Sequence, residues 1–247
     1  VCQPSLEEVA ENTPHAKSFQ IYVRGDDNWI RNLVRRVVKA QYASVTLTVD
    51  SAFYGNRERL NPAQLVLRRV PAREWQKKIT WETVKLIQDV IGDIPLILKG
   101  IMTAEDAALA VEHGVKGIYI SNHGGRQLDH VLGNIQMLPE VVSAVDGKAE
   151  VFIDGGFTRG TDVVKALILG AKAVGIGRLQ AYALGAGGAE GLVRCLELLE
   201  REINTTMGLI GVTSLDQLSS ESITEAMPVT LPHEHSAFPH LPGGQVG

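Results

Sequence analysis

The sequence predicts an α/β fold, with the (β/α)8 TIM barrel as the favoured architecture. Short apolar runs rich in Val and Ile alternate with longer amphipathic segments, which is typical of a parallel sheet covered by helices. Polar residues gather at the carboxyl end of nearly every run, where barrel enzymes place their chemistry. The length of 247 residues is also close to the ~250 residues of a single barrel.

The short apolar runs are expected to form strands that are buried on both faces. In chain order they are Phe19–Val23, Val45–Val49, Pro95–Leu98, Gly117–Ile120, Val151–Ile153 and Ala173–Ile176. A faint internal repeat supports this alternation, because residues 110–120 and 167–176 each contain a helix end, a glycine, a lysine and then an apolar run. Repeated βα units of this kind build either a doubly wound sheet or a barrel.

Helices are expected between the runs, because apolar side chains recur there at helical spacing. They are Asp27–Tyr42, the segment around Trp81–Ile91, the segment from Thr103 to Gly114, and Thr161–Leu169. Thr103 followed by Asp106 resembles a capping box, and the last two helices each stop at a glycine, Gly114 and Gly170.

One domain is expected over residues 1–218, followed by an irregular tail over residues 219–247. The polar, Arg-rich stretch Tyr54–Lys78 is expected to form a loop over the site, where mobile loops often act as lids. Because the chain begins with Val1 and not with Met, we expect it to be a cut piece of a longer protein.

Composition excludes several classes of protein. A net charge of -4 and a pI near 6.0 do not indicate a broad nucleic-acid-binding surface. Cys2 and Cys195 cannot make a disulfide framework and point weakly to a reducing compartment. No apolar run approaches the ~20 residues of a membrane span, and no signal peptide is recognisable. His233, His235 and His240 have no supporting Cys or carboxylate cluster, so no functional metal site is expected.

Polar, charged and glycine residues lie at or just after the carboxyl end of each predicted strand. They are Gln20 and Tyr22, Thr48 and Asp50, Lys99, then Asn122, His123 and Arg126, then Asp154, Gly155, Gly156 and Arg159, and finally Gly177 and Arg178. A lysine directly after an apolar run is hard to explain by packing, because a buried ammonium needs a polar partner. The glycines after the last two strands suit a phosphate, which this fold usually binds there. The sequence therefore predicts an anion site at the carboxyl ends of the strands.

His123 is the candidate base of this site. An imidazole is the natural proton acceptor near neutral pH, and a carboxylate such as Asp50 would orient it and stabilise its cation. Arg126, three residues after His123, would hold a substrate carboxylate through two hydrogen bonds.

These motifs resemble those of the FMN-dependent α-hydroxy-acid oxidases and dehydrogenases, which include glycolate oxidase and flavin-linked L-lactate dehydrogenase. The resemblance runs from about Leu6 to Leu218 and is most specific at Ser121–Asp129. Further matching blocks are Phe19–Val23, Leu47–Asp50, Leu98–Gly100, Ile153–Gly156, Arg159–Asp162 and Gly175–Arg178.

The resemblance implies FMN-dependent oxidation of an L-2-hydroxy acid to a 2-oxo acid. In that reaction His123 is the base, Asp50 is its carboxylate partner, and Tyr22 places a hydroxyl near the reacting carbon. Arg126 and Arg57 are the implied ligands of the substrate carboxylate. The implied FMN contacts are Gln20, Thr48, Lys99 at the flavin N1–O2 edge, Asp154, Gly155, Gly156, Arg159, Gly177 and Arg178.

The resemblance also implies partners and a location. The electron acceptor is oxygen, a quinone or a cytochrome, and the protein is a tetramer or larger homo-oligomer. A cytoplasmic location is expected, with peroxisome or mitochondrion as alternatives. No nucleic acid and no membrane span are expected.

This sequence departs from the family pattern at its start. In the family two barrel strands precede the segment that begins here, so the first two strands of the barrel are expected to be missing. An open sheet would expose two edges and leave one side of the flavin pocket unbuilt. Two alternatives to an active flavin enzyme therefore stay open: a non-catalytic fragment or degenerate homologue with impaired FMN binding, and a different phosphate-binding barrel such as an isomerase or lyase.

Overall fold

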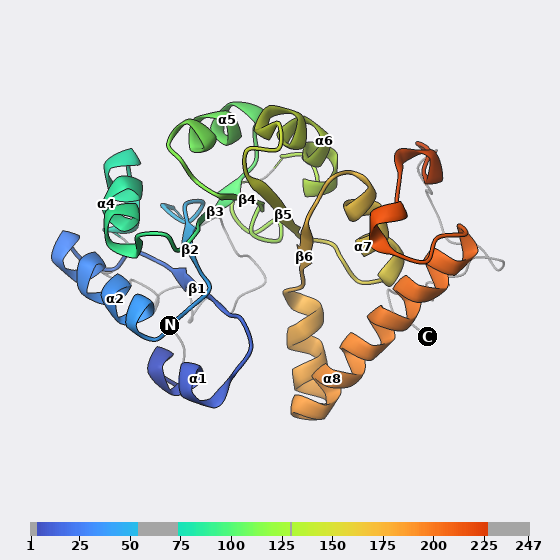
Figure 1. The fold of residues 1–247 in the computed structure, drawn as a ribbon, viewed down its shortest axis with the longest axis horizontal. Helices are drawn as coiled ribbons and strands as arrows, with labels where there is room; N and C mark the ends of the chain where they lie inside the picture. The colour runs from blue at the N-terminus through green and yellow to red at the C-terminus, as the bar shows by residue number, and fades with distance from the viewer. Residues whose placement is uncertain (1–3, 54–73, 129, 227–247) are drawn as a thin grey trace.

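The computed structural model describes residues 4–53, 74–128 and 130–226, and Figure 1 shows the arrangement of their helices and strands. The strands are β1 (Ser18–Ile21), β2 (Ser44–Thr48), β3 (Leu96–Ile101), β4 (Gly117–Ile120), β5 (Glu150–Asp154) and β6 (Ala173–Gly175). The α-helices are α1 (Leu6–Asn12), α2 (Asp27–Lys39), α4 (Trp81–Ile91), α5 (Ala104–Glu112), α6 (Asn134–Val145), α7 (Gly160–Ile168) and α8 (Arg178–Leu209). Short 3₁₀ turns occur at Gln76–Lys78, Leu215–Gln217 and Ser220–Ser222.

The strands of the described part form one six-stranded parallel sheet in the order β1 to β6, so each strand pairs with the next one along the chain. The sheet curls, and α2, α4, α5 and α6 cover its convex side in an arc (Figure 1). This is the βα order and curvature of a TIM barrel, and it confirms the predicted fold class. Within the described residues β1 and β6 each pair on one side only, so the sheet does not close there.

The helices begin where local chemistry favours them. The Asp26 side chain accepts a hydrogen bond from the backbone N–H of Trp29 at 2.9 Å, which caps α2. Thr103 caps α5 in the same way through the N–H of Asp106, so the predicted start of this helix is confirmed. The predicted end of α2 is wrong: the helix stops at Lys39, and Gln41 has a positive φ of 55° that no continuing helix allows.

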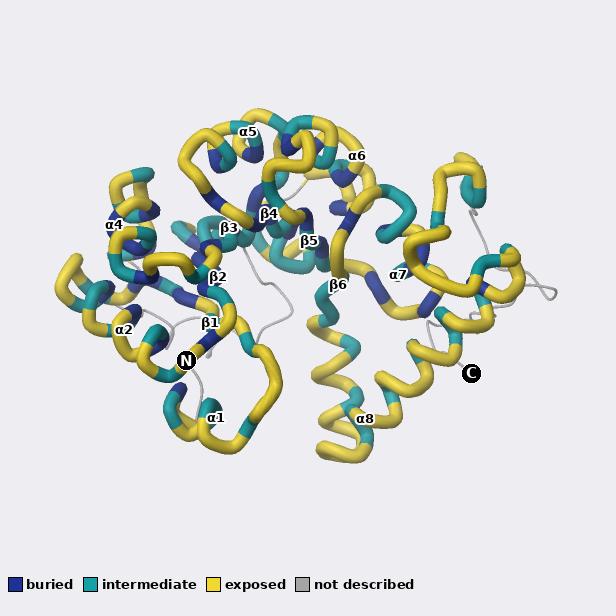
Figure 2. The backbone as a smooth tube through the Cα atoms, viewed as in Figure 1, coloured by how far each residue is buried: buried dark blue, intermediate teal, exposed yellow. Residues whose placement is uncertain are grey.

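The two faces of the sheet differ. The expectation of strands buried on both faces holds for β2, where Thr46 and Thr48 are also buried, but β3, β4 and β5 are only partly buried on the concave face. The convex face carries fully buried apolar side chains, which are Val45, Leu47, Leu98, Ile118, Ile120 and Ile153. In Figure 2 the buried, dark blue stretches occur along the strands and on parts of the helices that cover them. On the concave face Thr48, Lys99 and Tyr119 are register partners on adjacent strands, so they point to the same side. Polar groups are therefore gathered inside the curve of the sheet, and this gathering positions the site.

Strand β3 does not end at Lys99, as the sequence suggested. It continues to Ile101 through a register shift between Lys99 and Ile101. Gly100 allows this irregularity with a φ of +108°. Lys99 therefore lies within a paired strand and is held more firmly than a loop lysine would be.

Three of the described helices, α1, α6 and α8, are not among those that apolar spacing predicted. Helix α6 contains Pro139 and α8 is rich in glycine. Both residue types are unfavourable inside helices, so the sequence of these segments does not indicate a helix. Helix α8 also changes direction at Gly187 and Gly188, whose backbone angles are not helical. Arg178 is the first residue of α8, so it follows β6 as predicted but belongs to a helix.

Other expectations fall mostly outside the described residues. The loop expected over Tyr54–Lys78 is described only from residue 74 onward, and this part contains the turn at Gln76–Lys78. The three tail histidines and the tail beyond residue 226 lie outside the described residues. In the part of the chain that the structure describes, no helix has both the length and the apolar character needed to cross a bilayer.

Candidate active site

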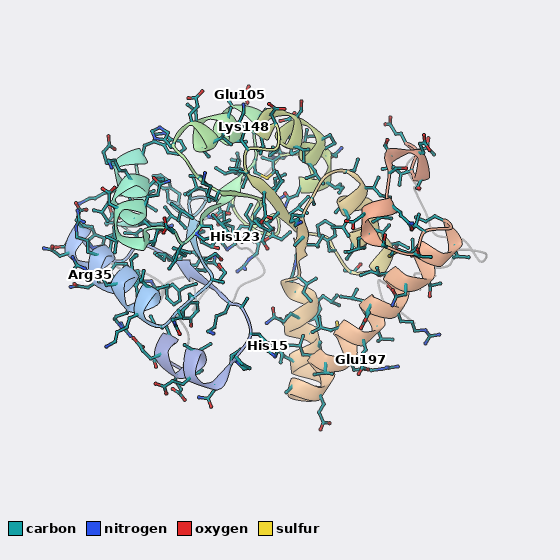
Figure 3. All side chains as sticks on the ribbon, in the orientation of Figure 1. His15, Arg35, Glu105, His123, Lys148 and Glu197 are labelled. Carbon is teal, nitrogen blue, oxygen red and sulfur yellow. The ribbon has the colours of Figure 1, made fainter. Side chains whose placement is uncertain are left out.

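A cavity of about 610 Å³ opens at the carboxyl ends of the strands. Ten of the predicted site residues line it: Gln20, Tyr22, Lys99, His123, Arg126, Asp154, Gly155, Gly156, Gly177 and Arg178. His123 lies near the centre of the molecule in Figure 3. The structure therefore brings these ten residues together around one cavity.

His123 and Asp50 form a close pair. The Nδ1 atom of His123 lies 3.1 Å from each carboxylate oxygen of Asp50. Both side chains are mostly buried, with 19% and 10% of their surface exposed. A carboxylate in this position favours the tautomer with a proton on Nδ1, which leaves Nε2 as the basic nitrogen. The pair can therefore accept a proton and stabilise the imidazolium that results.

The loop that carries His123 is tightly folded. His123, Gly124 and Gly125 have positive φ angles of 58°, 71° and 69°. Such angles are uncommon for a residue other than glycine, and they persist at sites that the surrounding structure constrains. Here the Asn122 side chain accepts from the N–H of Gly125 at 2.9 Å, and the Ser121 hydroxyl accepts from the N–H of His123 at 3.1 Å. The ring is thus presented to Asp50 by a backbone that side chains hold in place.

Lys99 has three partners on the concave face of the sheet. Its ammonium donates to the Ser121 hydroxyl and pairs with an Asp154 carboxylate oxygen, both at 2.7 Å. It also lies 4.7 Å from the centre of the Tyr119 ring, within reach of a cation–π interaction. Burial raises the pKa of Tyr119 above its usual range, and the nearby Asp154 carboxylate adds to this effect. The phenol therefore stays protonated, and the cation is held at the centre of the site.

Gln20 links the first two strands. Its Nε2 atom donates to the Thr48 hydroxyl at 2.6 Å and to the Tyr22 hydroxyl oxygen at 3.2 Å. Thr48 has no exposed surface, so it orients Gln20 and does not face the cavity itself. Gln20 and Tyr22 are the side chains of this group that a ligand can reach.

At Gly156 and Gly177, which follow β5 and β6, no described side chain covers the backbone. Gly155 and Gly156 have φ angles of +89° and +86°. No atom lies within 4 Å of where a side chain on Gly156 or Gly177 would begin. The Arg178 guanidinium donates to the carbonyl of Gly124 at 3.2 Å, so it spans from the end of β6 to the His123 loop. Backbone N–H groups and a guanidinium together suit an anionic group.

Of the predicted contacts that the structure describes, Thr48 and Arg159 do not line the cavity. Arg57 lies outside the described residues. The guanidinium of Arg159 contacts Glu202 of α8, with Nε and Nη2 at 2.8 Å and 2.6 Å from one carboxylate oxygen. Its hydrogen bond holds the pKa of Glu202 below the usual value of 4.5. In this structure Arg159 joins α7 to α8.

Some site residues were missed in the sequence. Gln127 donates to two backbone carbonyls in the segment after β2, those of Asp50 at 2.6 Å and Phe53 at 2.9 Å. Asn134 donates to the carbonyl of Asp154 at 2.6 Å. Gln127 lies within the most specific motif, which was the available signal. Asn134 begins a helix that the sequence did not reveal, so it had no signal. Among residues 4–53, 74–128 and 130–226, no group of three or more His, Cys, Asp or Glu side chains could hold a metal ion.

Comparison with known proteins identifies the family of this chain. A family model described as FMN-dependent dehydrogenase matches residues 1–225. The chain is 40% identical over 246 residues to an L-lactate oxidase of Nostoc sp., covering 87% of this chain and 67% of that protein. It is 40% identical over 244 residues to the glycolate oxidase of Spinacia oleracea, covering 89% and 66%. A solved structure of mandelate oxidase with (S)-2-phenylpropionate aligns at a TM-score of 0.76 and 40% identity, covering 86% and 64%. The chain thus spans about two thirds of the length of these relatives.

Proposed function

This chain belongs to the FMN-dependent dehydrogenase family, and from that premise we propose that it oxidises an L-2-hydroxy acid to a 2-oxo acid with FMN as its cofactor. The relatives named above are oxidases of lactate, glycolate and mandelate. Their shared chemistry supports a small 2-hydroxy acid as the substrate class here.

The observation that carries the proposal is the pair of His123 and Asp50 beside a cavity that Arg126 also lines. Oxidation of a 2-hydroxy acid needs a base for the proton that leaves the substrate and a cation for its carboxylate. His123 supplies the base and Arg126 supplies the cation. Tyr22 lines the same cavity and offers a hydroxyl toward the reacting carbon.

The residues present fit FMN. The open backbone at Gly156 and Gly177, next to Arg178, suits the phosphate. Lys99 supplies a fixed positive charge farther inside the cavity. When bound, FMN supplies the acceptor for the two electrons that the substrate loses.

The proton has a defined route within the chain. Nε2 of His123 takes it from the substrate, and the Asp50 carboxylate at Nδ1 stabilises the resulting imidazolium. Arg126 holds the substrate carboxylate and so aligns the hydroxyl-bearing carbon with the base. We further propose Arg57 as a second carboxylate ligand. Oxygen is the proposed electron acceptor, with a quinone or cytochrome as the other acceptors to test.

The test compares the chain, purified with added FMN, with its His123→Ala variant. We expect the wild-type chain to show flavin absorbance and to oxidise L-lactate or glycolate. In His123→Ala, turnover should fall by about 10²- to 10⁴-fold with FMN binding retained, because a general base contributes about that factor. His15→Ala is the matched control, since His15 is exposed and does not line the cavity.

Two results would contradict parts of this proposal. If His123→Ala kept its turnover, His123 would not be the base. If the wild-type chain took up no FMN, the enzyme proposal would fail for this polypeptide, and the alternative of a non-catalytic homologue with impaired FMN binding would replace it.

A further inference from the structure

The position of the Asp50 carboxylate is determined from three sides. The Ser51 hydroxyl donates to one of its oxygens at 2.8 Å. Behind it, Gly100 leaves the space that Asp50 occupies, because a Cβ on Gly100 would lie 2.6 Å from the Cβ of Asp50. Gln127 holds the backbone carbonyl of Asp50. The carboxylate that contacts His123 is therefore kept in place by its surroundings, not by His123 alone.

Gln127 makes the link that joins the two halves of the pair. It lies four residues after His123 on the same loop, and its Nε2 atom reaches across to the carbonyls of Asp50 and Phe53. Both hydrogens of its amide nitrogen are used, one on each carbonyl. These two hydrogen bonds thus connect the segment after β2 to the loop after β4, directly beside the contact between Asp50 and His123.

A role in stability alone does not account for this side chain. The Oε1 atom of Gln127 is buried and has no hydrogen-bond partner among the described residues. A buried acceptor without a partner is unfavourable, and an apolar side chain of the same shape would avoid that cost. Gln127 also does not line the cavity, so it would not touch a ligand there. The distinctive contribution of Gln127 is its two N–H donors, one of which binds the backbone carbonyl of Asp50, the partner of His123.

We infer that Gln127 is a positioning residue: its hydrogen bonds to two backbone carbonyls keep the Asp50 carboxylate next to Nδ1 of His123. The inference rests on the proposed function, in which His123 is the base. Loss of the two donors would let the segment after β2 shift, and the ring of His123 would lose its fixed orientation.

The first test is the Gln127→Met variant, which keeps the shape of the side chain and removes its donors. We expect kcat to fall about 10- to 100-fold, because small displacements of a catalytic group have effects of this size. The KM for substrate and the dissociation constant of FMN should stay within about twofold of the wild-type values, since Gln127 does not line the cavity.

Gln88→Met is the matched control. Gln88 also donates to a backbone carbonyl, that of His113, but it lies on α4 outside the cavity. An unchanged kcat in Gln127→Met would overturn the inference.

A double variant separates positioning from general destabilisation. If Gln127 acts through Asp50, adding Gln127→Met to Asp50→Ala should lower kcat no further. If the two substitutions multiply, Gln127 acts by another route and the inference is wrong.

The last test does not need turnover. The ring ¹⁵N shifts of His123, assigned by comparison with His123→Ala, report the hydrogen bond between Nδ1 and Asp50. We expect this signature to weaken in Gln127→Met, and an unchanged signature would contradict the inference. Gln127→Asn, which is too short to reach both carbonyls, serves if Gln127→Met does not fold. A wild-type chain that oxidises no 2-hydroxy acid would count against the proposed function, while the ¹⁵N comparison would still decide the role of Gln127.

Discussion

The ammonium group of Lys99 is mostly buried, with 12% of its side chain exposed, and such a charge needs compensation. Asp154 supplies the opposite charge, Ser121 accepts a hydrogen bond, and the face of Tyr119 lies below the cation. The carboxylate of Asp154 depends on Lys99 in the same way. The two side chains therefore stabilise the site only as a pair.

Removing one member of that pair tests this dependence. We expect Lys99→Met to lower the free energy of unfolding by about 3 kcal/mol, because it leaves the Asp154 carboxylate buried without its partner. The measurement is urea denaturation of the chain without ligand. Adding Asp154→Asn to Lys99→Met should recover part of the loss, and a double variant as unstable as the sum of the two single variants would contradict the pairing.

At the scale of elements, α7 meets α8 through a close contact. The N–H of Gly160 donates to the Glu202 carboxylate at 2.7 Å, and Arg159 pairs with the same carboxylate. A Cβ on Gly160 would lie 2.5 Å from the Cβ of Glu202 and 2.6 Å from the backbone nitrogen of Ile203. The start of α7 therefore packs directly on the backbone of α8, and one acidic residue binds both partners at the junction.

This junction should depend on pH. The hydrogen bond from Arg159 lowers the pKa of Glu202 in the folded chain. Its stabilising effect is therefore present above the usual pKa of 4.5 and is lost as the pH falls through the lower pKa of the folded chain. We expect Glu202→Gln to be less stable than the wild type at neutral pH, with the difference shrinking below about pH 4. Urea denaturation at several pH values measures it. Glu197→Gln, at an exposed ion pair with Arg194, should change stability little at any of them.

The closeness of α7 and α8 has a second consequence. Gly160→Ala should lower the free energy of unfolding by about 1–3 kcal/mol, because the added methyl group would overlap backbone that cannot move freely. Gly185→Ala is the matched control within α8, since nothing lies within 4 Å of its added Cβ. The control should be neutral or stabilising by up to about 1 kcal/mol. Thermal denaturation measures the stability of both variants. An equal change in stability for Gly160→Ala and Gly185→Ala would contradict the packing argument.

At the scale of the whole molecule, the cavity gathers side chains from nearly every strand of the described sheet. Gln20 comes from β1, Lys99 from β3 and Asp154 from β5, while Arg178 begins the helix after β6. A ligand that touches all of them would connect elements that are far apart along the chain. Its binding energy would therefore add to the stability of the sheet as a whole.

FMN should consequently raise the melting temperature of the chain. At a free FMN concentration of 100 times the dissociation constant, the stabilisation should be about 2.7 kcal/mol. Riboflavin, which lacks the phosphate, should stabilise less, and Arg178→Met should reduce the advantage of FMN over riboflavin. Equal stabilisation by the two flavins in the wild-type chain would contradict a phosphate site at Gly177 and Arg178.

Local patterns in the sequence determined the strands, most of the helices and the polar ends of the strands. His123 and Asp50 are 73 residues apart, yet their contact follows from the fold class, because parallel strands bring their carboxyl ends to one edge. The family resemblance carried by the same motifs is confirmed by the match over residues 1–225.

Only the tertiary structure decided the rest. Arg159 turns to Glu202, 43 residues later, and Gln127 reaches back 77 residues to Asp50. Local sequence cannot reveal either contact, because the direction of a long polar side chain depends on which acceptors the packed chain places within about 3 Å of it. Glu202 lies beyond the kink in α8, and Gly100 lies directly against Asp50. Residue types and spacing therefore specified the chemistry of the site, and packing between distant segments specified which groups hold one another in place.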